Sequence, residues 1–335
     1  REVLYKEKQK FNMARDREMG EFRMWWVKEM IETPSPQTER LVLFWHNHFV
    51  STYPALDENS TSLARQNLMF RRQGSGNFRV MLKEIIRDAA MLNYLDNDNN
   101  KRNAPNENLA RELLELFTLG EGNYDEHTVK EAARALTGYR TNELRDLSFE
   151  ISPWDQDRGL KNILGSWGFH DGDDLIDLIL DQPSASEFIT RKFWRHYVSE
   201  FQFNESEIQA ISFLFRTSDY DIKTLLKATL QTPHFWDPKA RGAIIKSPVD
   251  LIIGTIRTTG ILPTTWRGIP GQLSMLNQNL FGQPNVAGWP GGGAWITPAN
   301  LLNRHYVLNS LSAGGVINTN TRTDERIDNS EEKRL

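Results

Sequence analysis

Hydrophobic residues recur every three or four positions along most of the chain, which is the pattern of helices with one buried face. The segment GEFRMWWVKEMI, residues 20–31, illustrates it, because Phe22, Trp26 and Met30 share one side of a helix that ends before Pro34. The same period dominates the rest of the sequence. It predicts a mainly α-helical fold.

Helix starts are marked by capping residues at four places. Ser35 with Pro36, and Ser247 with Pro248, have the residue types of an N-cap and a first helical position. Two further pairs have the spacing of a capping box, in which a side-chain acceptor is followed three residues later by glutamate. These pairs are Ser184 with Glu187 and Asn204 with Glu207. We expect a helix to begin at each of the four places.

Two long segments lack the helical period. Within residues 141–172, Phe149 and Ile151 are expected to form a short β-hairpin with Ile163 and Leu164. Residues 282–298 carry five glycines and two tryptophans, and their GWPGGGAW tract lacks the lysine of a phosphate-binding loop. The expected fold is therefore a large irregular helical domain with a short β-hairpin and long covering loops.

The chain also divides into three parts along its length. Residues 1–34 are expected to form an N-terminal helical segment that packs on the core. Residues 35–310 are expected to form the main helical domain, and residues 311–335 a polar C-terminal tail. A chain of 335 residues is long enough to bury one large core.

The hexapeptide FWHNHF, residues 44–49, places His46, Asn47 and His48 in a segment that is apolar on nearly every side. Buried polar groups cost free energy unless they are hydrogen-bonded, paired or bound to a ligand. The two histidines lie about 200° apart around a regular helix, so they cannot both bind one metal ion unless the chain is extended there. Each either binds a metal or bonds a separate buried partner, and a carboxylate such as Glu107 or Glu112 is the expected kind of partner.

The segment after Pro105, NENLARELLELFTLGEG, predicts an amphipathic helix that ends at Gly120 or Gly122. Glu107 and Arg111 are spaced for an ion pair within one helical turn. The polar face consists of Glu107, Asn108, Arg111, Glu112, Glu115 and Thr118. This face suits either contact with solvent or one side of a functional site.

Oxygen-bearing side chains precede this helix at the spacing of a calcium-binding EF-hand loop. Asp96, Asp98, Asn100 and Glu107 fall on loop positions 1, 3, 5 and 12. Lys101 stands where such a loop needs glycine, however. An Asx turn that caps the next helix at Asn106 is the simpler explanation.

Composition excludes several kinds of site. The chain has no cysteine, so it has neither disulfides nor thiolate metal ligands, whereas its imidazole and carboxylate groups suit zinc, iron or manganese. Its 40 basic and 44 acidic residues give a net charge of −4, which predicts no general attraction to nucleic acid. The longest apolar run, residues 41–45, is far too short for a transmembrane segment.

Three tracts stand out together: FWHNHF, then AMLNYLD followed by NENLARELLELFTLGEGNYDEHTVKEAARALTGY, and finally GQPNVAGWPGGGAWITPANLLNR. They resemble the bacterial family known as domain of unknown function 1800, and the resemblance runs from about Trp25 to Tyr306. It implies a periplasmic or secreted protein, often encoded near a protein similar to phosphatases and sulfatases. It implies no particular reaction.

The resemblance also selects residues. It places His46, Asn47 and His48 on the family's His-x-His tract, and Asn106, Glu107, Asn108, Arg111, Glu112 and Glu115 on its Asn-Glu-Asn-x-x-Arg-Glu tract. Many relatives carry a histidine and an aspartate before a Gly-x-Lys, and here the tract QDRGLK has Gln156 in place of that histidine. If relatives use the histidine as a ligand or proton carrier, this chain either lacks it or uses His170.

Two functions remain open. In the first, the chain is a metal-dependent enzyme in which Glu107 or Glu112 ligates the metal or acts as a base, and Arg111 holds a substrate anion. The metal ligands would be drawn from His46, His48, Asp96, Asp98 and Glu107, and the site would also include Asn47, Asn106, Asn108 and Glu115. In the second, the same residues fix the helix register of a non-catalytic scaffold that binds a partner protein or a surface polysaccharide. The ten tryptophans would then offer ring faces to sugars.

Overall fold

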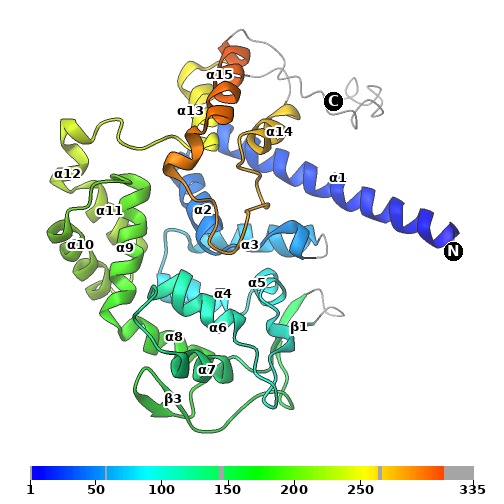
Figure 1. Ribbon diagram of the computed structural model, residues 1–335, viewed down its shortest axis with the longest axis vertical. Helices are drawn as coiled ribbons and strands as arrows, with labels where there is room; N and C mark the ends of the chain where they lie inside the picture. The colour runs from blue at the N-terminus through cyan, green and yellow to red at the C-terminus, as the bar shows by residue number, and fades with distance from the viewer. Residues whose placement is uncertain (1, 57–58, 143–146, 263–265, 313–335) are drawn as a thin grey trace.

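The computed structural model describes residues 2–56, 59–142, 147–262 and 266–312, and most of them are helical (Figure 1). The mainly α-helical class predicted from the sequence is confirmed. In these described ranges, no helix is both long and apolar enough to cross a bilayer.

The helices follow one another with short connections, except around the two irregular segments. The N-terminal half contains α1 (Glu2–Glu32), α2 (Pro36–His48), α3 (Ser60–Gln73), α4 (Phe78–Ile85), α5 (Ala89–Tyr94), α6 (Asn108–Glu112), its π-helical continuation η3 (Leu113–Thr118) and α7 (Glu126–Ala135). The C-terminal half contains α8 (Gly172–Asp181), α9 (Pro183–Tyr197), α10 (Glu205–Thr217), α11 (Ile222–Leu230), α12 (Pro233–Trp236), α13 (Pro248–Thr259), α14 (Gly268–Met275) and α15 (Pro298–Ser312). Short 3-10 turns lie at Tyr53–Ala55, Asn97–Asn99, Pro238–Ala240 and Gly292–Ile296.

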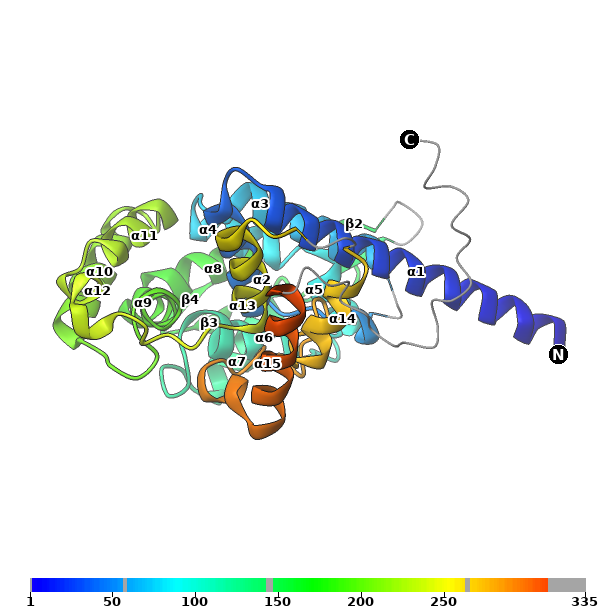
Figure 2. The ribbon, with the colours of Figure 1, turned by 90° about the horizontal axis from the view of Figure 1, so that it is seen from above.

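Helix α1 extends beyond the rest of the fold in both views (Figures 1 and 2). Its C-terminal part packs against α2, α3, α13 and α14. One hydrophobic core runs from Met19 on α1 to Leu311 on α15. The division at residues 34 and 310 stays a prediction, and residues 313–335 of the expected tail lie outside the described residues.

Helix α2 lies at the centre of this core, as its apolar circumference predicts. Leu41, Val42 and Leu43 are consecutive residues that face different sides of the helix, and all three are buried. Glu39, which is 4% exposed, forms an ion pair with Arg71 and accepts a hydrogen bond from Trp26 Nε1 at 2.9 Å. The buried charge is therefore compensated by partners from α1 and α3.

The strands form two hairpins in place of the expected one. Strand β1 (Tyr139–Asn142) pairs with β2 (Ser148–Ile151), and β3 (Lys161–Ile163) pairs with β4 (Ser166–Gly168), both antiparallel. The apolar residues of β2 and β3 are thus not partners of each other. Each strand pairs with its nearest neighbour in the sequence, which requires only a short loop to be closed.

The predicted N-caps at Asn204 and Ser247 are confirmed. The side chain of Asn204 accepts a hydrogen bond from Glu207 N, and that of Ser247 accepts one from Asp250 N. The prediction at Ser184 is wrong, because α9 already begins at Pro183. Proline has the φ angle of a helix and lacks an N–H that needs a partner, so it suits that first position.

Candidate functional site

His46 is buried in a group of aromatic rings. Its side chain lies 4.6 Å from Phe281 and 5.1 Å from Trp26, measured between ring centroids, and the residue is 1% exposed. Its Nε2 accepts a hydrogen bond from Phe281 N at 3.3 Å. Burial lowers the pKa of His46 to about 3, so the imidazole is neutral at physiological pH.

His48 connects α2 to η3 and α9. Its Nε2 donates to the carbonyl of Phe117 at 3.0 Å, and its Nδ1 accepts from Lys192 Nζ at 3.0 Å. The same Nζ donates to the carbonyl of Leu116 at 3.0 Å. Burial, and then the positive charge of Lys192, lower the pKa of His48 well below its usual value. Burial also lowers the pKa of Lys192, to about 8.

These contacts correct the expectation of a carboxylate partner. FWHNHF does touch the segment that follows Pro105, but His48 bonds a backbone carbonyl there rather than a carboxylate of Glu107 or Glu112. The reason lies at the end of η3, where the last carbonyls of a helix have no N–H partner within the helix. His48 and Lys192 supply the missing donors.

Asn47 fixes the glycine-rich loop to α2. Its Oδ1 accepts from Trp289 N at 2.7 Å, and its Nδ2 donates to the Trp289 carbonyl at 3.4 Å. Gly288 has a φ of 85°, and a Cβ there would lie 2.5 Å from the carbonyl oxygen of Asn47. Only glycine therefore fits this close approach. The three polar residues of FWHNHF thus anchor surrounding segments to the central helix.

The polar face of α6 is built from ion pairs close to solvent. Arg111 bonds Glu107 at 3.0 Å, as the spacing predicts, and also Glu126 at 2.7 Å. Partial burial, and then the neighbouring charge of Glu115, raise the pKa of Glu112. Glu115 accepts a hydrogen bond from Tyr124 at 2.8 Å. The catalytic roles of Glu107, Arg111 and Glu112 stay predictions.

The EF-hand spacing corresponds to a network of protein–protein hydrogen bonds. Asp98 accepts from Thr141 N and from Thr141 Oγ1, each at 2.9 Å. Asn100 Oδ1 accepts from Asn106 N at 2.9 Å, and Asn106 Oδ1 accepts from Asn108 N at 3.0 Å. The Asx turn at the start of α6 therefore explains the Asn106 part of this tract, and the side-chain oxygens of Asp98, Asn100 and Asn106 accept hydrogen bonds within the protein.

The residues predicted as metal ligands do not converge. Within the part of the chain that the structure describes, no three His, Asp or Glu side chains are grouped so that they could hold a metal ion. Both ring nitrogens of His48 have protein partners, and His46 Nε2 accepts a backbone N–H. His46, His48, Asp96, Asp98 and Glu107 are therefore not grouped as one metal site in the described structure, and their assignment as ligands stays a prediction.

The buried neutral histidines predict how stability depends on pH. The folded-state pKa values of His46 (about 3) and His196 (about 4) lie below the unfolded value of 6.5. The unfolded chain therefore binds more protons in this window, so stability is lost as the pH falls below 6.5. Each histidine should cost at most about 2 kcal/mol between pH 7 and pH 5. Urea denaturation at several pH values measures this loss.

A matched variant isolates one of the two histidines. His196 Nε2 is buried and has no hydrogen-bond partner among the described residues. Replacing His196 with leucine should therefore cost little at pH 7 and should remove that histidine's share of the acid-induced loss. An unchanged pH dependence in H196L would show that His196 does not contribute to it.

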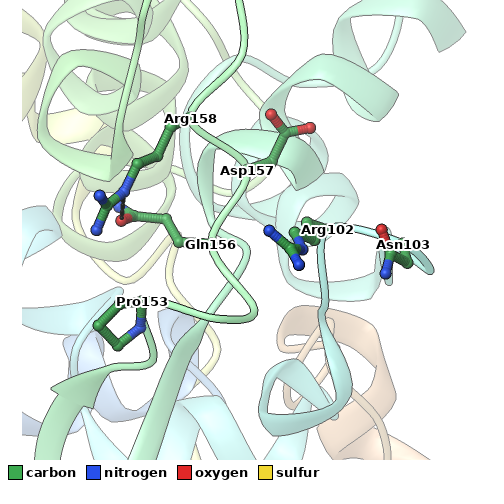
Figure 3. Close-up of a pocket in the computed structure, with 6 residues that line it drawn as sticks. All are labelled: Arg102, Asn103, Pro153, Gln156, Asp157 and Arg158. Carbon is green, nitrogen blue, oxygen red and sulfur yellow. Dashed lines mark hydrogen bonds between the residues drawn. The ribbon is translucent and has the colours of Figure 1, made fainter.

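A cavity of about 450 Å³ lies where the QDRGLK tract meets the loop before α6 (Figure 3). Its lining consists of Arg102, Asn103, Pro153, Gln156, Asp157 and Arg158. In Figure 3, Arg102 reaches from one side of the cavity toward Gln156 and Arg158 on the other. The two loop segments are joined by a hydrogen bond from Arg102 N to the carbonyl of Asp155, at 2.7 Å.

The lining carries excess positive charge. Asp157 accepts from Arg134 Nε at 2.7 Å and from Gly159 N at 2.8 Å. Partial burial raises the pKa of Asp157, but these bonds outweigh that effect and hold it below its usual value. Arg158 Nε donates to Gln156 Oε1 at 2.9 Å. The Arg102 guanidinium has no hydrogen-bond or ion-pair partner in the described parts of the chain.

No sequence pattern identifies Arg102 and Arg158 as members of one site. Gln156 stands out in the sequence only as a departure from a family pattern, for which His170 was the expected substitute. His170 Nε2 instead contacts the carbonyl of Ser166 at 3.2 Å. Arg102 is held near the QDRGLK tract by a backbone hydrogen bond to Asp155, the residue just before that tract. Because the two segments are far apart in the sequence, no local pattern indicates this bond.

Comparison with known proteins gives one match. The model of a family described as "Protein of unknown function (DUF1800)" matches residues 2–335. No curated protein and no solved structure matches the chain. The family match agrees with the resemblance found in the sequence.

Proposed function

The chain belongs to this family of unknown function, and we propose that it is a non-catalytic helical scaffold that binds an anionic surface polysaccharide. The polymer would place a sulfate or carboxylate group in the cavity between Arg102 and Arg158. One observation carries the proposal. Two guanidinium groups line the cavity, and Asp157, the one carboxylate among its described lining residues, is already paired with Arg134.

The chemistry of the lining suits such a ligand. A guanidinium group offers several N–H donors in one plane, which matches the oxygens of sulfate and carboxylate groups. Asn103 and Gln156 add amide groups that hydrogen-bond sugar hydroxyls. Trp154 is 82% exposed and follows Pro153 of the lining, so its ring face is free to stack on a sugar.

The FWHNHF tract supports a scaffold role rather than a catalytic one. His46, Asn47 and His48 hold the loop of residues 282–298, η3 and α9 in place through their hydrogen bonds. The hypothesis of a metal-dependent enzyme draws less support, because His48 and Asp98, two of the ligands that it needs, bond other groups of the protein. Buried hydrogen-bond networks of this kind fix one arrangement of a core.

Two further proposals come from the family resemblance. We propose that the chain is exported to the periplasm or the medium, and that it associates with a phosphatase- or sulfatase-like protein encoded nearby. Such a partner would act on the same class of anionic group that Arg102 and Arg158 would bind. Cell fractionation tests export, and co-purification from native extract tests the association; a protein confined to the cytosol, or one that purifies alone, contradicts the respective proposal.

Calorimetric titration tests the binding function directly. A sulfated oligosaccharide should bind, and a neutral glucan of equal length should bind at least tenfold more weakly. Raising the salt concentration from 0.1 M to 1 M should lower the affinity for the sulfated ligand. Salt at 1 M shortens the electrostatic screening length from about 10 Å to about 3 Å. Equal binding of neutral and sulfated ligands would contradict a site based on charge.

A further inference from the structure

A second cavity, of about 480 Å³, lies between α2, the end of α1 and α13. Its apolar wall includes Met30, Leu43, Val249 and Ile253, which are each less than 10% exposed. These side chains are recessed rather than spread over an exposed face. The volume lies within the range of small-molecule sites, about 300 to 1,000 Å³.

Both acidic side chains in the lining are already neutralised. Glu39 is paired with Arg71. Asp250 accepts from Arg40 at 3.0 Å and from Ser247 Oγ at 2.9 Å. These partners come from the protein itself. Neither carboxylate therefore needs a cation from a ligand.

The lining cations are not equally engaged. Arg257 donates to the carbonyls of Ile31 and Thr33 at the end of α1, at 2.6 Å and 3.1 Å. The Lys246 ammonium, in contrast, has no hydrogen-bond or ion-pair partner among the residues described. The cavity thus combines an apolar wall with one available positive charge.

An independent observation lies next to Lys246. Arg304 on α15 donates through Nη2 to the carbonyl of Lys246 at 3.0 Å, and its Nη1 is buried without a partner in the described structure. A buried donor without an acceptor is costly, so such groups point to an absent acceptor. Arg304 is thus a second cation at the backbone of Lys246, although it is not part of the cavity lining.

We propose that this cavity binds a small amphipathic carboxylate of the fatty-acid type. Its hydrocarbon chain would lie against Met30, Leu43 and Ile253, and its carboxylate would bond the Lys246 ammonium. The apolar wall contributes affinity for the chain, and the free charge selects an acid over an alcohol. This inference is separate from the polysaccharide site at Arg102 and Arg158.

Gly254 provides a way to block the cavity without disturbing the fold. It lines the cavity from α13, and a Cβ built on it would meet no atom within 4 Å. Replacing this glycine with leucine adds a good helix former and fills open space. We expect wild type to bind decanoate and G254L to bind it at least tenfold more weakly, with thermal unfolding no earlier than in wild type.

Two comparisons test the role of the charge. Wild type should bind decanoate more tightly than decanol. The K246M variant should lose that preference while still binding decanol. The R102Q/R158Q variant, which changes the other cavity, should bind decanoate as wild type does. Titration calorimetry with monomeric ligand measures each case. The proposal is overturned if wild type binds neither ligand, if folded G254L binds decanoate normally, or if decanol binds as well as decanoate. A clear preference for an apolar peptide with a free C-terminal carboxylate would also overturn it, since the cavity would then belong to a peptide end.

Discussion

Replacement of both Arg102 and Arg158 with glutamine is expected to weaken binding of a sulfated oligosaccharide about 100-fold. A hydrogen bond to a charged group contributes about 1.5 to 3 kcal/mol, and each 1.4 kcal/mol is a factor of ten in affinity. Loss of one such bond at each arginine therefore gives the stated factor as a lower estimate. Glutamine keeps a polar side chain at both positions. Calorimetric titration at 0.1 M salt provides the measurement.

A charge-matched variant separates the site from the net charge. Arg17 on α1 and Arg241, just after the 3-10 turn Pro238–Ala240, are both exposed, and neither lines the cavity. Replacing this pair with glutamine changes the net charge by the same amount and should alter the affinity by less than about threefold, because surface charges act weakly through salt solution. If both double variants lose affinity equally, the affinity depends on the net charge of the protein and the proposed site is wrong.

The His48→Ala variant is expected to lower the free energy of unfolding by about 3 to 4 kcal/mol. The substitution leaves a hole among Phe44, Phe49 and Phe117, whose rings lie around the imidazole. It also removes a donor from the Phe117 carbonyl and an acceptor from Lys192. An unsatisfied buried group costs about 1 to 3 kcal/mol. Urea denaturation at pH 7 measures the change.

Two comparisons distinguish a structural role of His48 from a functional one. The His48→Gln variant retains hydrogen-bonding groups, so it should lose less stability than His48→Ala. Folded His48→Ala should bind the sulfated ligand as wild type does. A variant that keeps its stability but loses a stoichiometric metal ion would contradict the scaffold account and restore the metal-dependent hypothesis.

Features that depend on neighbours within about four residues could be predicted from the sequence. The caps at Asn204 and Ser247 and the Glu107–Arg111 ion pair belong to this class, as does the helical period itself. The turn at Asn106 was predicted for the same reason, since its acceptor bonds the N–H only two residues ahead. Local hydrogen bonding decides all of these features.

Features that depend on chain segments far apart could not be predicted. The sequence indicated that His48 needs a partner, but Lys192 lies 144 residues away and the Phe117 carbonyl is a backbone group that no side-chain pattern reveals. The cavity between Arg102 and Arg158 exists only because two loops are bonded at Asp155.

A crystal structure of the chain with a sulfated disaccharide tests the central claim most directly. The account predicts that the sulfate group lies between Arg102 and Arg158 and accepts hydrogen bonds from both guanidinium groups. It also predicts that FWHNHF keeps the hydrogen bonds of His46, Asn47 and His48 unchanged. A sulfate bound at FWHNHF or on the polar face of α6, with the Arg102 cavity empty, would contradict it.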